Sequence, residues 1–386
     1  MRVLKLVFKN ALRHKLRTSL TILGLAIAVM AFGVLRTVVD MWYAGVEATA
    51  PNRLITRQAV SFVFPLPYSY RDKIAKIPGV EAVSFANWFQ GTYVDKNQFF
   101  ARMAVDAESF FQVYPEFQID PKEYETFKRE RNSCIVGASI AKQYKFNIGD
   151  VIPIDGDIYP GRWEFVVRGI YRPRDKTTDA TQMLFHWTYL DERMKQDMPV
   201  RAGWVGWFII KIKDPAQSAV ISEQVDALFK NSPNETKTET ERAFTQGFIS
   251  GLSSLLAAMN FVSFVIIGII MLVLGNTMIM SARERIREFA VFKTLGFSAF
   301  HLVGLILGES LLISALGAGI GLAITYPIVA GIAAILPSGF FPIFYITPAT
   351  LLLAASAALL VGVAASIFPI HRALHMRIVD GLRFIG

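Results

Sequence analysis

The distribution of apolar positions divides the chain into long uncharged runs and one segment of mixed polarity. Residues 18–35 form an uncharged run of 18. As a helix with a rise of about 1.5 Å per residue, this run spans roughly 27 Å, close to the hydrocarbon thickness of a bilayer. Residues 246–282 contain no Asp, Glu, Lys or Arg, and between Lys293 and Arg372 the only such residue is Glu309. These runs predict helices that cross a membrane.

Turn-forming residues divide the last of these runs. Pro337, Gly339, Pro342 and Pro348 would interrupt a continuous helix. We therefore expect four membrane-spanning helices, at residues 18–40, 246–280, 299–335 and 347–370, with an outer turn at 336–346. A cleaved signal peptide is the alternative for the first run, but no clear small-residue cleavage site ends it.

The segment of mixed polarity, residues 41–245, has the alternation and the turn residues of a folded α/β domain. The pattern predicts strands at 53–56, 79–85, 99–105 and 204–213, and helices at 68–76 and 215–230. Residues 116–198 are predicted to form a β-rich insertion.

Basic residues cluster in three places and predict the orientation. The chain has 40 Lys and Arg against 31 Asp and Glu, and 13 of the basic residues, with only three acids, lie in residues 1–17, 281–298 and 371–386. Since short loops rich in Lys and Arg remain cytoplasmic, both termini and the 281–298 segment are predicted to be cytoplasmic. The predicted fold class is an α-helical membrane protein with four transmembrane helices and a large α/β extracytoplasmic domain between helices one and two. The rest of the chain is nearly neutral, which argues against a nucleic-acid partner.

Residues 1–17 have the periodicity of an amphipathic helix. Five apolar residues recur at helical spacing between the basic ones: Leu4, Val7, Phe8, Ala11 and Leu12. We expect a cytoplasmic amphipathic helix that contacts membrane lipid. A flank that only sets the topology is the alternative.

Residues 281–298 are too polar to span the membrane and too helix-prone for a plain loop. Glu284 and Glu288 lie one helical turn apart, and Gly296 supplies a C-terminal stop. A short cytoplasmic helix with mixed charges and an apolar face suits docking to a soluble partner. On physical grounds alone, a solvated loop helix explains the segment equally well.

Glu309 is the only formal charge in the last two predicted spans. An acid inside the membrane is a candidate functional residue. Three roles remain open for it: structural coupling near the inner interface, snorkelling of the carboxylate to that interface, and handling of substrate or protons.

Two further patterns have both a structural and a functional interpretation. Small residues at helical spacing pack helices closely, within one chain or between subunits; they are Gly304 with Gly308, Gly317 with Gly321, and Ala354 with Ala358 and Gly362. The aromatic runs of the α/β domain, at 62–64, 88–89 and 110–111, are either core or a surface for an adaptor or a lipid-like substrate.

The chain lacks the patterns of catalysis and of metal binding. Its single cysteine, Cys134, and its five His residues do not have the spacing of a metal site, and His186 is expected to be an ordinary, partly buried histidine. The phosphate-binding pattern Gly-x-x-x-x-Gly-Lys-Ser/Thr does not occur. We therefore expect a non-enzymatic chain without catalytic, metal-binding or cofactor-binding residues.

The segment from Ser281 to Gly296, followed by Glu309 in the next apolar run, resembles the FtsX-like permease domain of type VII ABC transporters. That superfamily includes macrolide-exporter, lipoprotein-release and DevC-type permeases and the cell-division protein FtsX. Residues 12–24 look like the family's entry to the first span. Residues 134–141, 148–150 and 167–170 look like its periplasmic core, and residues 369–383 like its closing segment. The family often has two arginines where this chain has His371 and Arg372.

The resemblance implies a permease subunit of the cell inner membrane. A separate ATPase, which would hold ATP and Mg, would drive movement of the periplasmic domain by mechanotransmission, for export or extraction of a hydrophobic or lipid-like substrate. The resemblance assigns the ATPase coupling to eight residues of the 281–298 segment: Arg283, Glu284, Arg285, Arg287, Glu288, Phe292, Lys293 and Gly296.

The resemblance also implies a second permease copy. The homodimer or heterodimer would be joined through spans one and two, where Asn260, Ser263 and Asn276 lie. A periplasmic adaptor and an outer-membrane channel are further partners found in the family. The alternative function is a transmembrane signal transducer of FtsX type, which activates a periplasmic hydrolase or sensor without transport.

Overall fold

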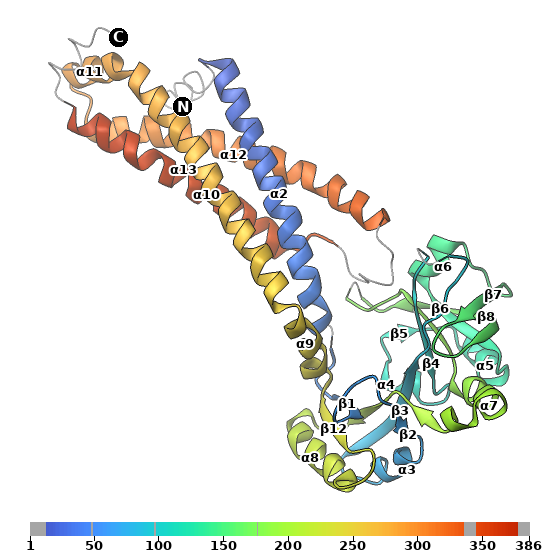
Figure 1. Cartoon of the computed structure of the whole chain (residues 1–386). Helices are drawn as coiled ribbons and strands as arrows, with labels where there is room; N and C mark the ends of the chain where they lie inside the picture. The colour runs from blue at the N-terminus through green and yellow to red at the C-terminus, as the bar shows by residue number, and fades with distance from the viewer. Residues whose placement is uncertain (1–12, 48, 96–97, 176, 336–344, 377–386) are drawn as a thin grey trace. The chain divides into compact units, whose positions relative to one another are not determined.

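The structure, a computed structural model, describes residues 13–47, 49–95, 98–175, 177–335 and 345–376. The chain divides into two compact units (Figure 1). The helical unit comprises residues 1–40, 253–334 and 344–386, and the α/β unit comprises residues 41–252 and 335–343. Most of the predicted amphipathic helix, most of the predicted outer turn and the tail beyond Met376 lie outside the described residues.

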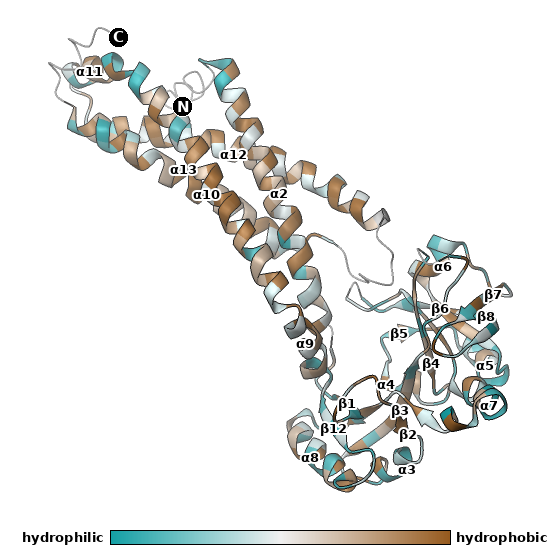
Figure 2. Ribbon diagram, viewed as in Figure 1, coloured by the Kyte–Doolittle hydropathy of each residue, from teal (hydrophilic) through white to brown (hydrophobic). Residues whose placement is uncertain are grey.

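The described residues contain four helices that are long and apolar enough to cross a membrane. They are α2 (Lys15–Glu47), α10 (Ser253–Glu284), α12 (Ala299–Ile335) and α13 (Pro348–His375). Figure 2 shows apolar residues along most of their lengths. A short helix, α11 (Ile286–Thr294), connects α10 to α12. The predicted class, four apolar helices with an α/β domain between the first and the second, is confirmed.

Two helices differ in extent from the predicted spans. Helix α2 continues past residue 40 to Glu47. Helix α10 begins at Ser253 and not at 246, because the chain leaves the helical conformation at Leu252, between α9 (Glu241–Gly251) and α10. At its other end α10 stays helical through Glu284, since no Gly or Pro interrupts the polar residues after 280.

Small residues pack α12 against α2 and α13. A Cβ atom on Gly317 would lie 2.5 Å from Leu25 Cδ2, and one on Gly321 would lie 2.6 Å from the carbonyl oxygen of Ala26. A Cβ atom on Gly362 of α13 would lie 2.4 Å from Ser314 Oγ. These glycines therefore serve packing within the chain, whereas Gly304 faces open space.

The α/β unit is built on a ten-stranded mixed sheet in the order β12-β1-β11-β3-β4-β9-β6-β8-β5, with β7 paired to β8. Its strands are β1 (Arg53–Gln58), β3 (Val80–Trp88), β4 (Ala101–Val105), β5 (Phe117–Gln118), β6 (Ser133–Gly137), β7 (Val151–Gly156), β8 (Gly161–Pro173), β9 (Gln182–His186), β11 (Trp207–Ile212) and β12 (Thr236–Thr240). Strands β2 (Leu66–Pro67) and β10 (Trp204–Val205) form a separate pair.

Residues 116–198, predicted as a β-rich insertion, contribute strands β5 to β9 and three helices. These strands continue the main sheet, because β9 pairs in parallel with β4 and antiparallel with β6. The segment is therefore half of one α/β sheet. Sequence alternation predicts strands but does not determine which strands pair.

Helices cover both faces of the sheet, and alternating strand residues point to each face. One face carries α3 (Tyr70–Ile74), α6 (Ala138–Tyr144), α7 (Trp187–Asp197) and α8 (Ser218–Phe229). The other face carries α4 (Phe110–Val113) and α5 (Pro121–Arg129). On β9, Met183 and Phe185 point to the first face and Leu184 to the second.

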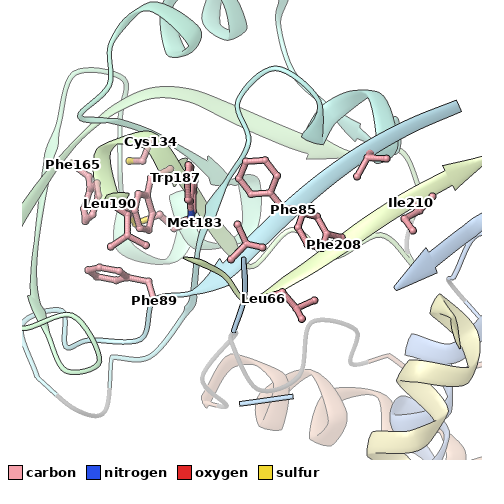
Figure 3. Packing of buried hydrophobic residues seen from close by; sticks show 14 of the residues in the cluster. Leu66, Phe85, Phe89, Cys134, Phe165, Met183, Trp187, Leu190, Phe208 and Ile210 are labelled. Carbon is pink, nitrogen blue, oxygen red and sulfur yellow. The ribbon is translucent and has the colours of Figure 1, made fainter. Parts of the chain in front are cut away.

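Aromatic side chains pack against one another in the larger core. Figure 3 shows Phe85 close to Trp187 at the start of α7, and Phe208 of the neighbouring strand beyond Phe85. The ring centroid of Phe85 lies 5.2 Å from that of Trp187 and 6.3 Å from that of Phe208. Cys134 lies in the same core, and burial raises the pKa of its thiol. This thiol is therefore a small apolar core group and not a reactive one.

Candidate functional site

Helix α11 ends as its sequence predicts, at a glycine in the left-handed conformation. Gly296 has φ +81°, its N–H donates to Lys293 O (3.2 Å), and the N–H of Phe297 donates to Phe292 O (3.0 Å). The rings of Phe292 and Phe297 pack with centroids 5.2 Å apart. Two hydrogen bonds and an apolar contact thus form a Schellman motif that fixes the exit from α11.

A buried ion pair joins the start of α11 to α12. Arg285 Nη1 donates to Glu309 Oε2 (3.0 Å), and Ser281 Oγ donates to Glu309 Oε1 (3.1 Å). Arg285 is 7% exposed and Glu309 is 5% exposed. Because a buried charge requires a partner, each of these residues holds the other in place. Of the three roles considered for Glu309, this geometry supports structural coupling.

Glu288 connects α11 to the start of the chain. It accepts hydrogen bonds from Arg285 Nε (3.0 Å) and from Arg13. Burial acts to raise the pKa of Glu288, but the bonds from Arg13 and Arg285 hold that pKa below its ordinary value. Glu284, one turn earlier, accepts two bonds from Arg17 (2.5 and 2.9 Å). Two carboxylates of the 281–298 segment, those of Glu284 and Glu288, thus bind residues at or just before the start of α2.

Lys293 fastens the other end of α11 to α13. Its Nζ donates to the carbonyl oxygens of Leu374 (2.9 Å) and Met376 (3.0 Å). These carbonyls belong to the C-terminal end of α13, where helix carbonyls lack intrahelical partners and a cation is favourable. The ends of α10, α11 and α13 and the starts of α2 and α12 gather at this end of the helical unit (Figure 1).

The opposite side of α11 is free of these contacts. Arg287, Val291 and Leu295 follow at intervals of four residues, and all three are exposed, Leu295 to 69%. Phe297 and Phe300, just beyond the helix, are exposed as well. We call Arg287, Val291 and Leu295 the outer stripe of α11.

The structure sorts the eight residues assigned to ATPase coupling into two groups. Six have structural contacts: Glu284, Arg285, Glu288, Phe292, Lys293 and Gly296. The side chains of Arg283 and Arg287 are exposed and make no hydrogen bond or ion pair with the part of the chain that the structure describes. Only the second group is available to a partner without first breaking a contact.

Sequence reasoning missed the residues that receive or complete these contacts. The sequence shows Arg13 and Arg17 only as basic residues that set the topology, and Ser281 only as the first residue of the 281–298 segment. It does not show their partners, which lie far away in the sequence. Arg17 and Glu284 are 267 positions apart. The signal available in the sequence was charge complementarity between the first basic segment and the acids of 281–298.

A second charged cluster, also missed, lies in the α/β unit where α9 begins. Arg53, at the start of β1 and 3% exposed, pairs with Glu241 (2.7 Å) and Glu116 (2.7 Å). Tyr114 donates to Glu241 (2.9 Å), and its ring lies 4.3 Å from the Arg53 guanidinium carbon. Burial raises the pKa of the Tyr114 hydroxyl well above its ordinary value, so that it remains a donor.

Of the aromatic runs, the structure exposes one and buries one residue of each of the others. Phe89 and Phe110 are core residues, while Val63 and Phe64 are exposed. A cavity of about 680 Å³ lies beside this exposed run, and its lining includes Phe62, Trp88, Tyr159, Trp204 and Trp207. The cavity is predominantly apolar and aromatic, as ligand cavities commonly are.

The described ranges contain no candidate metal cluster. No group of three or more His, Cys, Asp or Glu that could hold a metal occurs among those residues. His186 is 4% exposed, and its Nε2 lies 2.6 Å from Phe127 O. Burial lowers its pKa, which keeps the imidazole neutral in the core.

Models of known protein families match residues of both the helical unit and the α/β unit. Residues 260–378 match the family described as FtsX-like permease C-terminal, and residues 18–228 match the MacB-like periplasmic core domain. The fold and these matches define a membrane-embedded permease of ABC transporter type. The chain belongs to the FtsX-like permeases that carry a MacB-like periplasmic core domain. Membership in this family implies an ATPase partner in general.

Individual relatives are distant. An uncharacterised ABC transporter permease of Methanocaldococcus jannaschii is 21% identical over 345 residues, which cover 83% of this chain and 82% of that protein. One of Mycobacterium tuberculosis is 24% identical over 198 residues. That match covers 51% of this chain and only 22% of the mycobacterial protein.

Among solved structures, the periplasmic region of MacB from Actinobacillus actinomycetemcomitans aligns with a TM-score of 0.40 at 13% identity. It covers 53% of this chain and 95% of that one. The extracellular domain of the transporter YknZ from Gram-positive bacteria aligns with a TM-score of 0.36 at 10% identity, over 49% of this chain and 99% of that one.

Proposed function

We propose that this chain is the transmembrane subunit of an ABC transporter and that a separate ATPase docks on the outer stripe of α11. The observation that carries the proposal is the two-sided character of this helix. One side is held by Arg285, Glu288 and Lys293, while the other presents Val291 and Leu295 to solvent. The ATPase would bind ATP and Mg, and this chain would hydrolyse none itself.

Helix α11 is connected to all four long helices, so force applied to α11 would reach each of them. Arg285 connects it to α12 through Glu309, Glu288 connects it to the start of α2, and Lys293 connects it to α13. Helix α11 also follows α10 directly in the chain. A displacement of α11 would therefore move the same end of the four helices together, since packed interiors transmit strain.

Within the α/β unit, contacts connect the end of α2 to α9, and α9 to the sheet. A Cβ atom on Gly45, near the end of α2, would lie 3.9 Å from Thr245 of α9, and Glu241 of α9 binds Arg53 of β1. Motion of α2 and α9 would thus reach the sheet edge formed by β12 and β1. This is a mechanotransmission mechanism, in which the outer domain changes position or shape.

Orientation and assembly complete the proposal. The basic ends of the chain and α11 would lie in the cytoplasm, with the α/β unit outside the inner membrane. A second permease copy, identical or not, would pack on α10. The side chain of Asn276 is exposed on this helix and makes no hydrogen bond with the described residues, whereas Asn260 accepts one from Arg36 (3.4 Å). An unpaired amide in an apolar span favours a partner helix.

The substrate we infer is hydrophobic or lipid-like. The aromatic cavity of about 680 Å³ and the exposed Val63 and Phe64 beside it support this class. A periplasmic adaptor, and an outer-membrane channel beyond it, would complete an export path. A signal transducer that activates a periplasmic hydrolase needs no such cavity, and so the cavity favours transport over that alternative.

The test of ATPase docking is the variant Val291→Arg, made in the full chain and purified from native membranes. A large charged side chain in the centre of the outer stripe should prevent docking. We expect loss of the co-purifying ATPase, identified by mass spectrometry, and loss of its stimulated ATP hydrolysis. Val220→Arg is the matched control, because Val220 is an exposed helical valine of α8, 57% exposed.

Two outcomes would contradict the proposed docking. Either the wild-type chain brings down no ATPase, or Val291→Arg retains ATPase and turnover at the level of Val220→Arg. The folding of each variant is checked by its elution as a single species and by its helix content.

The substrate class has its own test, which uses a photoreactive fatty-acyl probe. Crosslinks are expected in the lining of the aromatic cavity, near Trp204 and Trp207. The variant Val63→Asp should reduce crosslinking, while Val220→Asp should not. Recovery of a periplasmic hydrolase without any crosslinked probe would instead favour the transducer.

A further inference from the structure

A cavity of about 410 Å³ lies at the same end of the helical unit as α11, lined by residues from the end of α10, the first half of α11 and the end of α13. Most of its lining is apolar and includes Ile286, Phe289 and Phe368, and we call this apolar lining the wall. Its lining also contains basic residues, which we call the rim: Arg283 and Arg372, together with His371 and His375. No Asp or Glu belongs to the lining that the described residues provide. The cavity thus combines an apolar wall with a positive rim that no acid of the described lining compensates.

The two arginines of the rim are unpaired within the part of the chain that the structure describes. Neither Arg283 nor Arg372 makes a side-chain hydrogen bond or an ion pair with the described residues, and both are exposed. The rings of His371 and His375 stack beside them with centroids 4.1 Å apart. A guanidinium group binds a phosphate with parallel hydrogen bonds, so this rim is complementary to a phosphate ester.

The apolar wall distinguishes a lipid from a free anion. Phe368 lines the cavity and is also 56% exposed on α13, next to Ile367, which is 62% exposed. Because α13 is a membrane-spanning helix, these side chains face acyl chains in the bilayer. An acyl chain beside Phe368 and a phosphate at Arg283 and Arg372 can therefore belong to one molecule.

We propose that this cavity binds one anionic glycerophospholipid of the inner leaflet. Its phosphate is held between Arg283 and Arg372, and an acyl chain covers Phe368 and Ile286. Basic pockets between spanning helices are the general form of such sites. The bound lipid contacts α11 through Ile286 and Phe289, on the side of that helix opposite the outer stripe. The proposal does not depend on ATPase docking or on the identity of the transported substrate.

The test measures lipid binding to the purified full chain by native mass spectrometry. Phosphatidylglycerol and phosphatidylcholine with identical acyl chains are titrated separately. The wild type is expected to bind one phosphatidylglycerol molecule in preference to phosphatidylcholine. The double variant Arg283→Gln, Arg372→Gln should weaken that binding by roughly five-fold for each arginine removed.

The matched control removes two other exposed cations from the same end of the helical unit. Lys15 and Arg287 are both exposed, make no side-chain bond with the described residues and do not line the cavity. The control variant Lys15→Gln, Arg287→Gln is expected to retain the wild-type preference. A charge-conserving variant, Arg283→Lys with Arg372→Lys, should retain most of the binding and shows that the fold tolerates change at these positions.

Four results would overturn the proposal. The first is equal phosphatidylglycerol binding by the glutamine variant and by the control. The second is competition by soluble glycerol phosphate as effective as that of the lipid, which would indicate an anion site. The third is lipid binding that appears only when residues 377–386 are deleted, which would make that segment the occupant. The fourth is unchanged lipid preference in the glutamine variant together with loss of the co-purified ATPase, which would make the cavity part of the ATPase surface.

Discussion

At the scale of single residues, the pairing of Arg285 with Glu309 explains why a carboxylate stands in an otherwise uncharged stretch of the chain. The Glu309 side chain accepts from Arg285 and Ser281, and side-chain exposure is 8% for Arg285 and 7% for Glu309. Taking two charges out of water costs several kcal/mol each, and their attraction and hydrogen bonds offset this cost. The pair therefore specifies where α11 attaches to α12 more than it adds stability.

This reasoning predicts non-additive mutational effects. Glu309→Leu alone leaves the Nη1 group of the buried Arg285 without its carboxylate, with Glu288 still bound at Nε. This change should destabilise the chain by at most about 3–5 kcal/mol. The double variant Glu309→Leu, Arg285→Met replaces the pair by apolar groups and should recover most of that loss. Thermal unfolding in detergent of the wild type, both single variants and the double variant measures the coupling. Equal loss in the single and the double variants would contradict the interpretation.

At the scale of elements, α11 is short and its direction depends on how it ends. Its Schellman motif requires the left-handed φ of +81° at Gly296, which side chains with a Cβ adopt only at a cost. The next helix, α12, begins at Ala299, so the conformation of Gly296 determines how α12 leaves α11. A single glycine thus controls the angle between the helix proposed to dock the ATPase and a membrane span.

Gly296→Ala should therefore destabilise this end of the helical unit by about 1–2 kcal/mol. Hydrogen exchange of the α11 amides is expected to accelerate accordingly. Gly304→Ala is the control, because a Cβ atom there meets no atom within 4 Å and lies inside a helix. That change should be neutral or slightly stabilising. Equal exchange in the two variants would show that the left-handed residue does not limit the stability of α11.

At the scale of the whole molecule, the proposed mechanism requires contacts that connect the helices to the sheet. In the α/β unit, Arg53 of β1 pairs with Glu241 of α9 and with Glu116, and it is nearly fully buried. Loss of one carboxylate would leave this arginine partly uncompensated. In the proposed mechanism, this cluster would be the place at which motion of α9 is passed to β1.

Glu241→Gln should uncouple the two units without preventing ATPase docking. We expect ATP hydrolysis stimulated by substrate to fall by roughly 2- to 30-fold, with unchanged co-purification of the ATPase. Glu239→Gln is the matched control, since Glu239 on the neighbouring strand pairs with Arg57 (3.2 Å) and not with the Arg53 cluster. A similar fall in both variants, or in neither, would argue against a transmitting role for Glu241.

The sequence by itself determined the four apolar helices, the α/β domain between the first two, the short helix after α10 and its stop at Gly296. These features depend on local periodicity, on charge-free length and on the conformational freedom of one glycine, all of which are properties of neighbouring residues. The sequence also singled out Glu309, because a lone acid is visible against an apolar background.

Only the tertiary structure decided which charges meet and which strands pair. Arg285 and Glu309 are 24 positions apart, Arg53 and Glu241 are 188 apart, and Arg17 and Glu284 are 267 apart. Residues 116–198 belong to the main sheet because β9 lies between β4 and β6, which no alternation pattern specifies. The physical reason is that such pairs depend on how whole elements pack, while a sequence pattern records only the preferences of each element.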